Sequence, residues 1–286
     1  LSGRCLPGRN TIALLLCHFG KHGFSHNDSG RAGLVFEAEL DGRVVSSDGS
    51  WRAREHPAYG SAAPPLPNYR LSEASVRFDA RADLAGWTGL GFDDASWPAA
   101  IELGAPPVAP WNELHRRPIP LWRNMGRKPY ASEETLERED GTRVVKAKLP
   151  GNLALGPCLR VRAPAGLAID IRTDDYRGGG AYNLRHEYVT RAGEQEYEAL
   201  GYLTGHEVLY TLPPAVEVLE LGYRETCFDT DVIGSFHCDE GFYDRLWRKS
   251  VATMLINMRD GIQDPDRERA QWWGDATIVL AEILAT

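Results

Sequence analysis

The residues best suited to chemistry lie near the end of the 286-residue chain, where positions 264–275 read DPDRERAQWWGD. Carboxylates in such a segment can accept hydrogen bonds from sugar hydroxyls, and an indole face can cover the apolar side of a sugar ring. A carboxyl group beside an indole is partly removed from water, which favours the protonated form that a general acid needs. The segment therefore predicts a carbohydrate site rather than a solvated loop. The side chains concerned are Asp264, Asp266, Arg267, Glu268, Arg269, Trp272, Trp273 and Asp275.

Two amphipathic segments flank these residues and predict a helix on each side. Apolar residues recur every three to four positions over 242–258 and again over 276–284. Asp239 is placed to cap the first helix, and Asp260 with Gly261 to end it. Pro265 and Gly274 are expected to keep the intervening residues out of regular helix. The chemistry-bearing residues are thus predicted to lie in an interhelical loop.

The chain before residue 233 predicts β structure. Short strand-like runs at 11–17, 33–40 and 75–80 precede two proline-rich stretches, 62–67 and 105–120. Further runs at 144–149, 158–161, 167–171, 207–212 and 216–221 have prolines between them, at positions 150, 157, 164, 213 and 214. This pattern predicts β modules over 1–120 and 121–232, followed by a helical part over 233–286.

Composition excludes several classes of function. The formal net charge of −8 argues against a nucleic-acid partner, and no apolar run is long enough to span a membrane. The five cysteines are scattered without a C-x-x-C pair, which predicts buried thiols in a reducing compartment such as the bacterial cytoplasm. Cys17, His18, His22 and His26 are interpreted as ordinary loop residues rather than a zinc site, and residues 177–181 as a loop rather than a phosphate site.

Residues 264–275 resemble the signature of glycoside hydrolase family 78, the α-L-rhamnosidases, in which D-C-P-x-R-E-R followed by W-x-G-D opens the catalytic domain. Further similarity lies in FDAR at 78–81, GFDDASW at 91–97, GEQEYE at 193–198, GYLTG at 201–205 and YRET at 223–226. The resemblance implies two all-β sandwich or jelly-roll-like modules followed by the first helices of an all-α (α/α)6 barrel. The chain begins with Leu and stops within a helical pattern, so we expect it to be a piece of a longer protein.

The same resemblance implies roles for individual residues. Glu268 corresponds to the general acid of an inverting exo-α-L-rhamnosidase that needs neither metal nor cofactor. Asp264, Arg267 and Asp275 are expected to bind the substrate, a rhamnose-containing oligosaccharide or glycoside. Trp272 or Trp273 is expected to pack on the sugar ring and its 6-methyl group. The general base of the family lies further downstream than this chain reaches, so the chain alone is expected to be inactive.

The chain departs from the family signature at one position. The family has Cys between the first Asp and Pro, whereas Pro265 directly follows Asp264 here. Glu268 therefore keeps its spacing to Asp275, but Asp264 lies one residue closer to both. Two other interpretations stay open at this point: a six-hairpin glycosidase for a different sugar, and a non-catalytic carbohydrate-binding protein.

Overall fold

A computed structural model describes residues 5–174 and 184–286 of the chain, so the predicted loop at 177–181 lies outside the described residues. The chain forms two compact units. Unit 1 comprises residues 1–21, 28–58 and 82–116, and unit 2 comprises residues 22–27, 59–81 and 117–286. The last segment of unit 2 begins at residue 117, and two earlier segments, 22–27 and 59–81, also belong to it.

Unit 1 is largely irregular and contains one β-hairpin. Strand β1 (Glu37–Leu40) pairs antiparallel with β2 (Arg43–Ser46). Asp41 and Gly42 both have positive φ, as the tight two-residue turn requires. The strand predicted at 11–17 is wrong: this segment has no strand structure, and Leu14, Leu15 and Leu16 are all more than 40% exposed. An apolar run becomes a strand only where a neighbouring strand supplies hydrogen-bond partners.

Unit 2 contains a sheet of ten strands. Eight follow the order β3-β4-β9-β8-β11-β7-β12-β5, and β6 and β10 pair with β7 off this path. All pairings are antiparallel except β4 with β9, which is parallel. A short 3₁₀ helix (Ala80–Ala82) follows β4. The strands are β3 (Tyr59–Ser61), β4 (Val76–Asp79), β5 (Trp122–Lys128), β6 (Ser132–Glu137), β7 (Arg143–Ala163), β8 (Ala168–Thr173), β9 (His186–Val189), β10 (Gly193–Glu198), β11 (Leu203–Leu212) and β12 (Glu217–Phe228).

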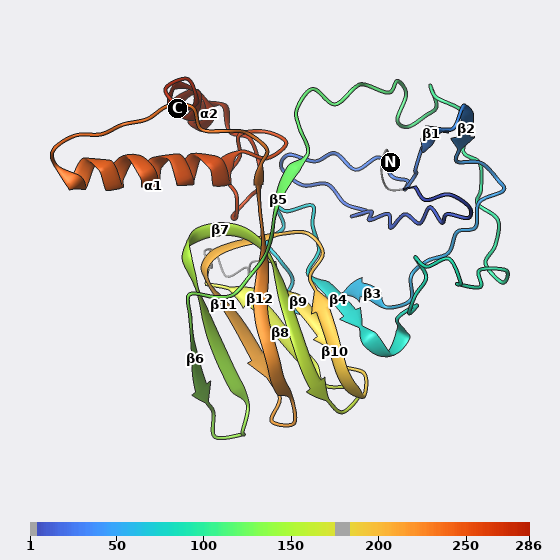
Figure 1. The fold of residues 1–286 in the computed structure, drawn as a ribbon, viewed down its shortest axis with the longest axis horizontal. Helices are drawn as coiled ribbons and strands as arrows, with labels where there is room; N and C mark the ends of the chain where they lie inside the picture. Colours follow the sequence, from blue (N-terminus) through green and yellow to red (C-terminus); the bar gives the residue numbers. More distant parts are fainter. Residues whose placement is uncertain (1–4, 175–183) are drawn as a thin grey trace. The chain divides into compact units, whose positions relative to one another are not determined.

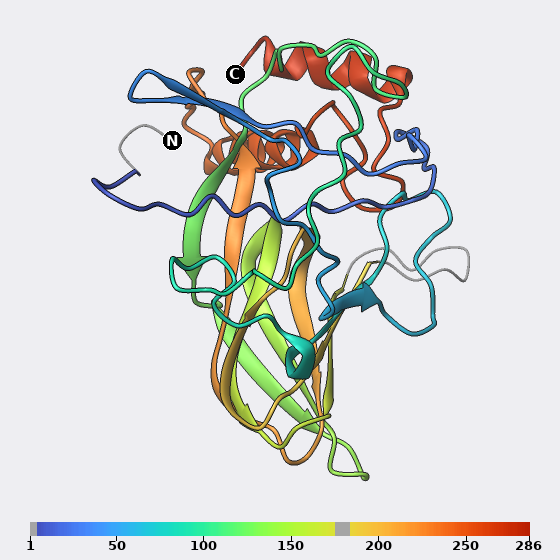
Figure 2. The same cartoon turned by 90° about the vertical axis from the view of Figure 1, so that its right-hand side faces the viewer.

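The long strand β7 links two groups of strands. Its first part pairs with β6 up to Lys148, and its second part pairs with β12 and β10 from Leu155 onward. Strand β11 pairs with residues 143–148 and 153–155, on both sides of a register shift. The prediction that Pro150 and Pro157 separate strands is wrong, because both lie within β7. Pro150 is tolerated because it lies in the register shift between β7 and β11, where residues 149–152 have no paired partner and no ladder bond needs its missing N–H. Figure 2 shows the strands curving around a common interior.

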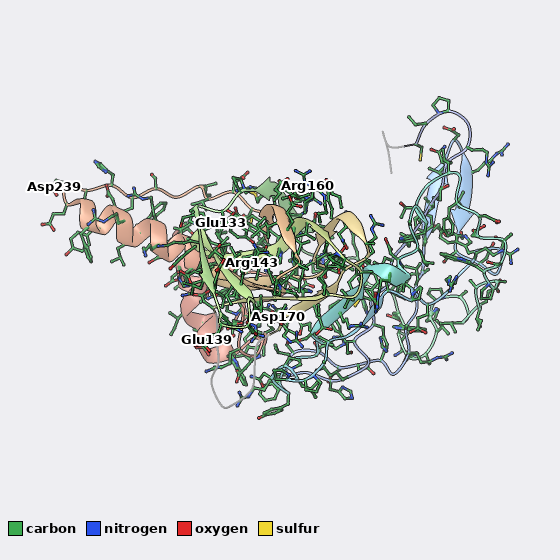
Figure 3. The ribbon with its side chains drawn as sticks, turned by 90° about the horizontal axis from the view of Figure 1, so that it is seen from below. Glu133, Glu139, Arg143, Arg160, Asp170 and Asp239 are labelled. Carbon is green, nitrogen blue, oxygen red and sulfur yellow. The ribbon has the colours of Figure 1, made fainter. Side chains whose placement is uncertain are left out.

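Alternating side chains of the strands fill that interior. On β11, Val208, Tyr210 and Leu212 are fully buried, at the spacing of two that one strand face requires. The hydroxyl groups of Tyr130 and Tyr210 lie 2.7 Å apart within the core, and burial raises the pKa of both phenols. On the exposed face, Arg160 of β7, labelled in Figure 3, pairs with Glu194 and Glu220 across neighbouring strands.

Two helices lie at one end of the strands in both Figure 1 and Figure 2. Helix α1 (Gly241–Asn257) follows Glu240 as its N-cap, so the predicted cap at Asp239 is wrong by one residue. It ends before Asp260, because Met258 is extended and pairs with Ile262. Helix α2 (Trp273–Ile283) begins earlier than predicted and includes Gly274 in its first turn. Glycine is tolerated there because its cost within a helix is only about 1 kcal/mol relative to alanine.

The cysteines are free thiols, but the prediction that they are buried is wrong for most of them. Cys158 is buried, Cys227 and Cys238 are partly buried, and Cys5 and Cys17 are exposed. Within the described part of the chain, neither helix combines the length and the apolar composition that a membrane span requires. Residues 5–174 and 184–286 likewise contain no group of three metal-ligating side chains close enough to share an ion.

Candidate carbohydrate site

Asp264 organises the connection between α1 and α2. Its Oδ1 accepts hydrogen bonds from the backbone N–H groups of Asp266, Arg267 and Glu268, at 3.0, 2.6 and 3.3 Å. Its own N–H donates to the carbonyl of Ala270 at 3.1 Å. Because Oδ1 is occupied by the backbone, Oδ2 is the oxygen that remains for other partners, and it lies 3.8 Å from Nε of Arg267.

Glu268 is 7% exposed, accepts hydrogen bonds on Oε2 and forms an ion pair through Oε1. The indole Nε1 of Trp272 donates to Oε2 at 2.7 Å, and Nη2 of Arg267 lies 3.5 Å from the same oxygen. On the other oxygen, Nε of Arg70 lies 3.2 Å from Oε1. Burial of a carboxylate is tolerated when such charge-assisted bonds replace its hydration.

A small pocket of about 210 Å³ lies beside this carboxylate. Four of the six residues predicted for the site contribute to its lining: Asp264, Arg267, Trp272 and Asp275. Asn257, Ile262, Gln263, Pro265 and Val279 complete it. Glu268 is not among the lining residues but contacts the pocket wall through Trp272. Trp273 lies outside the lining and is 76% exposed in the first turn of α2.

The neighbouring Arg269 anchors the connection in unit 2. It has a positive φ of 47° and is 6% exposed. Its guanidinium pairs with Glu73 at 3.0 Å, donates to the carbonyl of Tyr202 at 2.7 Å and stacks 3.8 Å from the ring centre of Tyr202. Burial opposes its charge, but Tyr202 and Glu73 outweigh that effect and raise the pKa of Arg269. A positive φ is unfavourable for a residue other than glycine, and contacts of this kind offset that cost at Arg269.

Two further buried side chains, Arg259 and His186, lie in the surroundings of Arg269. The guanidinium of Arg259 lies over both Trp122 and Tyr202, 4.3 Å from each ring centre, and burial lowers its pKa. His186 on β9 is also buried, and burial together with the positive charge of Arg269 lowers its pKa to about 4. The connection between the helices is therefore held against the sheet by aromatic and charged groups, which confers a defined geometry on the pocket.

Sequence reasoning missed the residues that hold the connection from distant segments. Nδ2 of Asn68 donates to the carbonyl of Arg267 at 3.0 Å, across 199 positions of sequence. The hydroxyl of Ser25 donates to the carbonyl of Arg269. Arg70 and Glu73 supply the ion pairs already described. These side chains lie in irregular segments, where a charged or polar residue in the sequence looks like part of a solvated surface.

Comparison with known proteins finds similar sequences and folds. No family model matches the chain. The fold resembles the crystal structure of an α-L-rhamnosidase from Streptomyces avermitilis complexed with L-rhamnose, with 21% identity over 84% of the chain and a TM-score of 0.65. It also resembles that of the α-L-rhamnosidase from Dictyoglomus thermophilum, with 22% identity over 85% and a TM-score of 0.64. A curated α-L-rhamnosidase of Formosa agariphila is 25% identical over 221 residues, or 70% of the chain.

This chain is α-L-rhamnosidase-like. The resemblance drawn from residues 264–275 is thus confirmed by relatives found over most of the chain. The rhamnosidase-like chain spans 22% of the curated relative, and 27% and 24% of the two solved structures. The β part of the predicted fold agrees with the observed sheet, and the two helices follow it in the predicted order.

Proposed function

We propose that this chain is part of a longer inverting exo-α-L-rhamnosidase in which Glu268 is the general acid. One observation carries the proposal: Asp264, Arg267, Trp272 and Asp275 line one pocket, and Trp272 hydrogen-bonds Glu268 beside it. The chain's similarity to α-L-rhamnosidases supports the substrate class. Because the chain covers about a quarter of these relatives, the activity is proposed for the complete protein.

In the proposed reaction, Glu268 donates its proton to the glycosidic oxygen. The bond from that oxygen to the anomeric carbon breaks, its electron pair stays on the oxygen, and the alcohol departs. A water molecule adds to the opposite face of the anomeric carbon and loses its proton to a second carboxylate. In inverting enzymes the two carboxyl groups stand about 6.5–9.5 Å apart. We propose that this second carboxylate lies outside the present chain, which is then inactive by itself.

The pocket lining supports a sugar-binding site. We propose that Oδ2 of Asp264, the carboxylate of Asp275 and the guanidinium of Arg267 bind the sugar hydroxyls. Trp272, which is 40% exposed, is proposed to pack on the ring. The proposed exo-acting enzyme would bind one terminal rhamnose unit there.

The helices support a larger helical domain around the pocket. Phe242, Tyr243 and Leu246 on α1 are about half exposed, as is Leu280 on α2, and Ile278 is more exposed still. Contiguous apolar helix faces of this kind ordinarily pack against further elements. We propose that α1 and α2 are the first helices of an (α/α)6 barrel.

The test uses the complete protein with Glu268→Gln and the matched control Glu133→Gln, whose carboxylate lies exposed on β6 (Figure 3). Methyl α-L-rhamnoside needs a proton for departure, whereas 2,4-dinitrophenyl α-L-rhamnoside does not. Glu268→Gln should lower kcat on the methyl glycoside by about 10²–10⁴-fold and far less on the aryl glycoside. The first sugar released should be β-L-rhamnose. Unchanged turnover of the methyl glycoside would exclude Glu268 as the acid.

A further inference from the structure

A segment nearly two hundred positions upstream contacts the candidate acid. Arg70 lies in the irregular chain between β3 and β4, and its Nε lies 3.2 Å from Oε1 of Glu268. On either side of it, Asn68 donates to the carbonyl of Arg267 at 3.0 Å, and Glu73 pairs with Arg269 at 3.0 Å. Three consecutive residues of the helical connection are thus held by one short upstream segment.

Arg70 itself is held by backbone and ring contacts. Its N–H donates to Oδ1 of Asn68 at 3.1 Å, and its carbonyl accepts from the N–H of Phe24 at 2.8 Å. Its guanidinium lies over the rings of Phe24 and Tyr69, at 5.8 and 5.1 Å. The ring of Phe24 also contacts the indole of Trp272 edge-on, at 5.9 Å. Arg70, Phe24, Trp272 and Glu268 therefore form a closed ring of contacts.

This ring of contacts makes the two oxygens of Glu268 inequivalent. Oε2 faces Trp272 and Arg267, and both of these residues line the pocket. Oε1 faces Arg70, which does not line it. A carboxyl group that donates a proton in a fixed direction needs one oxygen restrained so that the other is aimed.

We infer that Arg70 is a positioning residue for the proton transfer, an inference that rests on the proposed role of Glu268. Arg70 holds Oε1, so that Oε2 carries the proton that passes to the glycosidic oxygen. When that proton leaves, Glu268 becomes a carboxylate, and the charge of Arg70 stabilises it at the moment when the bond to the leaving alcohol breaks. Arg70 does not touch the substrate in this scheme.

The experiment compares variants of Arg70 in the complete protein. Arg70→Met removes the charge and keeps much of the side-chain length, whereas Arg70→Lys restores the charge. Arg77→Met is the matched control, because Arg77 has a similar side-chain exposure of 37% against 30% but pairs with Asp79 and Glu187 on and beside β4. Gly23→Ala perturbs the backbone around Arg70 without changing Arg70 itself, since an added Cβ would meet the backbone nitrogen of Ser72 at 2.6 Å and the carbonyl of Arg70 at 2.9 Å.

Each variant is assayed on methyl and on 2,4-dinitrophenyl α-L-rhamnoside, and the ratio of the two kcat values is the readout. This ratio cancels the fraction of correctly folded enzyme, so a variant that folds poorly still gives an answer. Arg70→Met and Gly23→Ala should lower kcat on the methyl glycoside by about 10–100-fold and on the aryl glycoside by less than about 3-fold, with KM nearly unchanged. Arg70→Lys should recover part of the loss, and Arg77→Met should leave the ratio unchanged.

An Arg70→Met enzyme that loses activity equally on both substrates, or on neither, overturns the inference. If Glu268→Gln shows the leaving-group dependence but Arg70→Met does not, the proposed acid stands and only the role of Arg70 is lost. If Glu268→Gln itself shows no such dependence, the proposed function fails first. The two failures are therefore distinguishable in one set of assays.

Discussion

The indole Nε1 of Trp272 donates a 2.7 Å hydrogen bond to Oε2 of Glu268, which ties a residue of the pocket wall to a buried carboxylate. Trp272 immediately precedes α2 and serves as its N-cap residue, so the position of the indole depends on where that helix begins. The geometry around Glu268 is consequently set by the helical connection and the sheet together.

Replacing Trp272 by Phe keeps an aromatic wall but removes the donor to Glu268. A hydrogen bond to a charged group contributes about 1.5–3 kcal/mol, so Trp272→Phe should lower kcat of the complete enzyme on an alkyl rhamnoside by about 10–100-fold. Trp273→Phe should cost clearly less, because Trp273 is 76% exposed and outside the pocket lining. Steady-state kinetics on both variants checks this. A larger loss for Trp273→Phe would assign the ring-packing role to Trp273.

Asp264 should show separable structural and binding roles. Asp264→Ala leaves three backbone N–H groups without their acceptor and should lower the free energy of unfolding by about 1–3 kcal/mol. Asp264→Asn retains an oxygen for these donors but replaces Oδ2 by an amide, so its stability should stay close to that of the parent while L-rhamnose binds at least about 10-fold more weakly. Urea unfolding and titration calorimetry measure the two effects. Unchanged rhamnose affinity in Asp264→Asn would exclude Asp264 from the sugar site.

His186 should make the stability of unit 2 depend on pH. Its folded-state pKa of about 4 lies below the ordinary value of 6.5, so the unfolded chain binds a proton that the folded chain resists. The stabilisation is complete above pH 6.5 and is lost as the pH falls towards 4, by about 3 kcal/mol in total. His186→Phe should remove this part of the slope in urea unfolding followed by circular dichroism. The exposed His206, changed to Gln, serves as the control; the same slope in His186→Phe as in the parent would contradict the assignment.

Local sequence patterns predicted the features that depend on neighbouring residues. The helical spacing of Val251 and Met254 placed α1 to within a few residues, because both side chains occupy the buried stripe that a period near 3.6 demands. The strand-like run predicted at 207–212 lies within β11, where Val208, Tyr210 and Leu212 alternate on the buried face. The resemblance of residues 264–275 to a family signature implied six site residues, and four of them line one pocket.

Other features were decided by the tertiary structure. The run at 11–17 has strand composition but finds no partner strand, whereas Pro150 lies inside β7 because the register with β11 shifts there. Helix α2 begins at Trp273, although Gly274 predicted a loop, since the tertiary setting outweighs a weak local preference.

The surroundings of Glu268 show most clearly which features depend on local sequence and which depend on the tertiary structure. Its residue type and its distance from Asp275 are properties of the sequence alone. Its burial, its bond to Trp272 and its pairing with Arg70 arise only when segments nearly two hundred positions apart come together in unit 2. Periodicity and propensity depend on a few neighbouring residues, whereas a charge pair between distant loops depends on the path of the whole chain. No local sequence pattern can therefore predict such a pair.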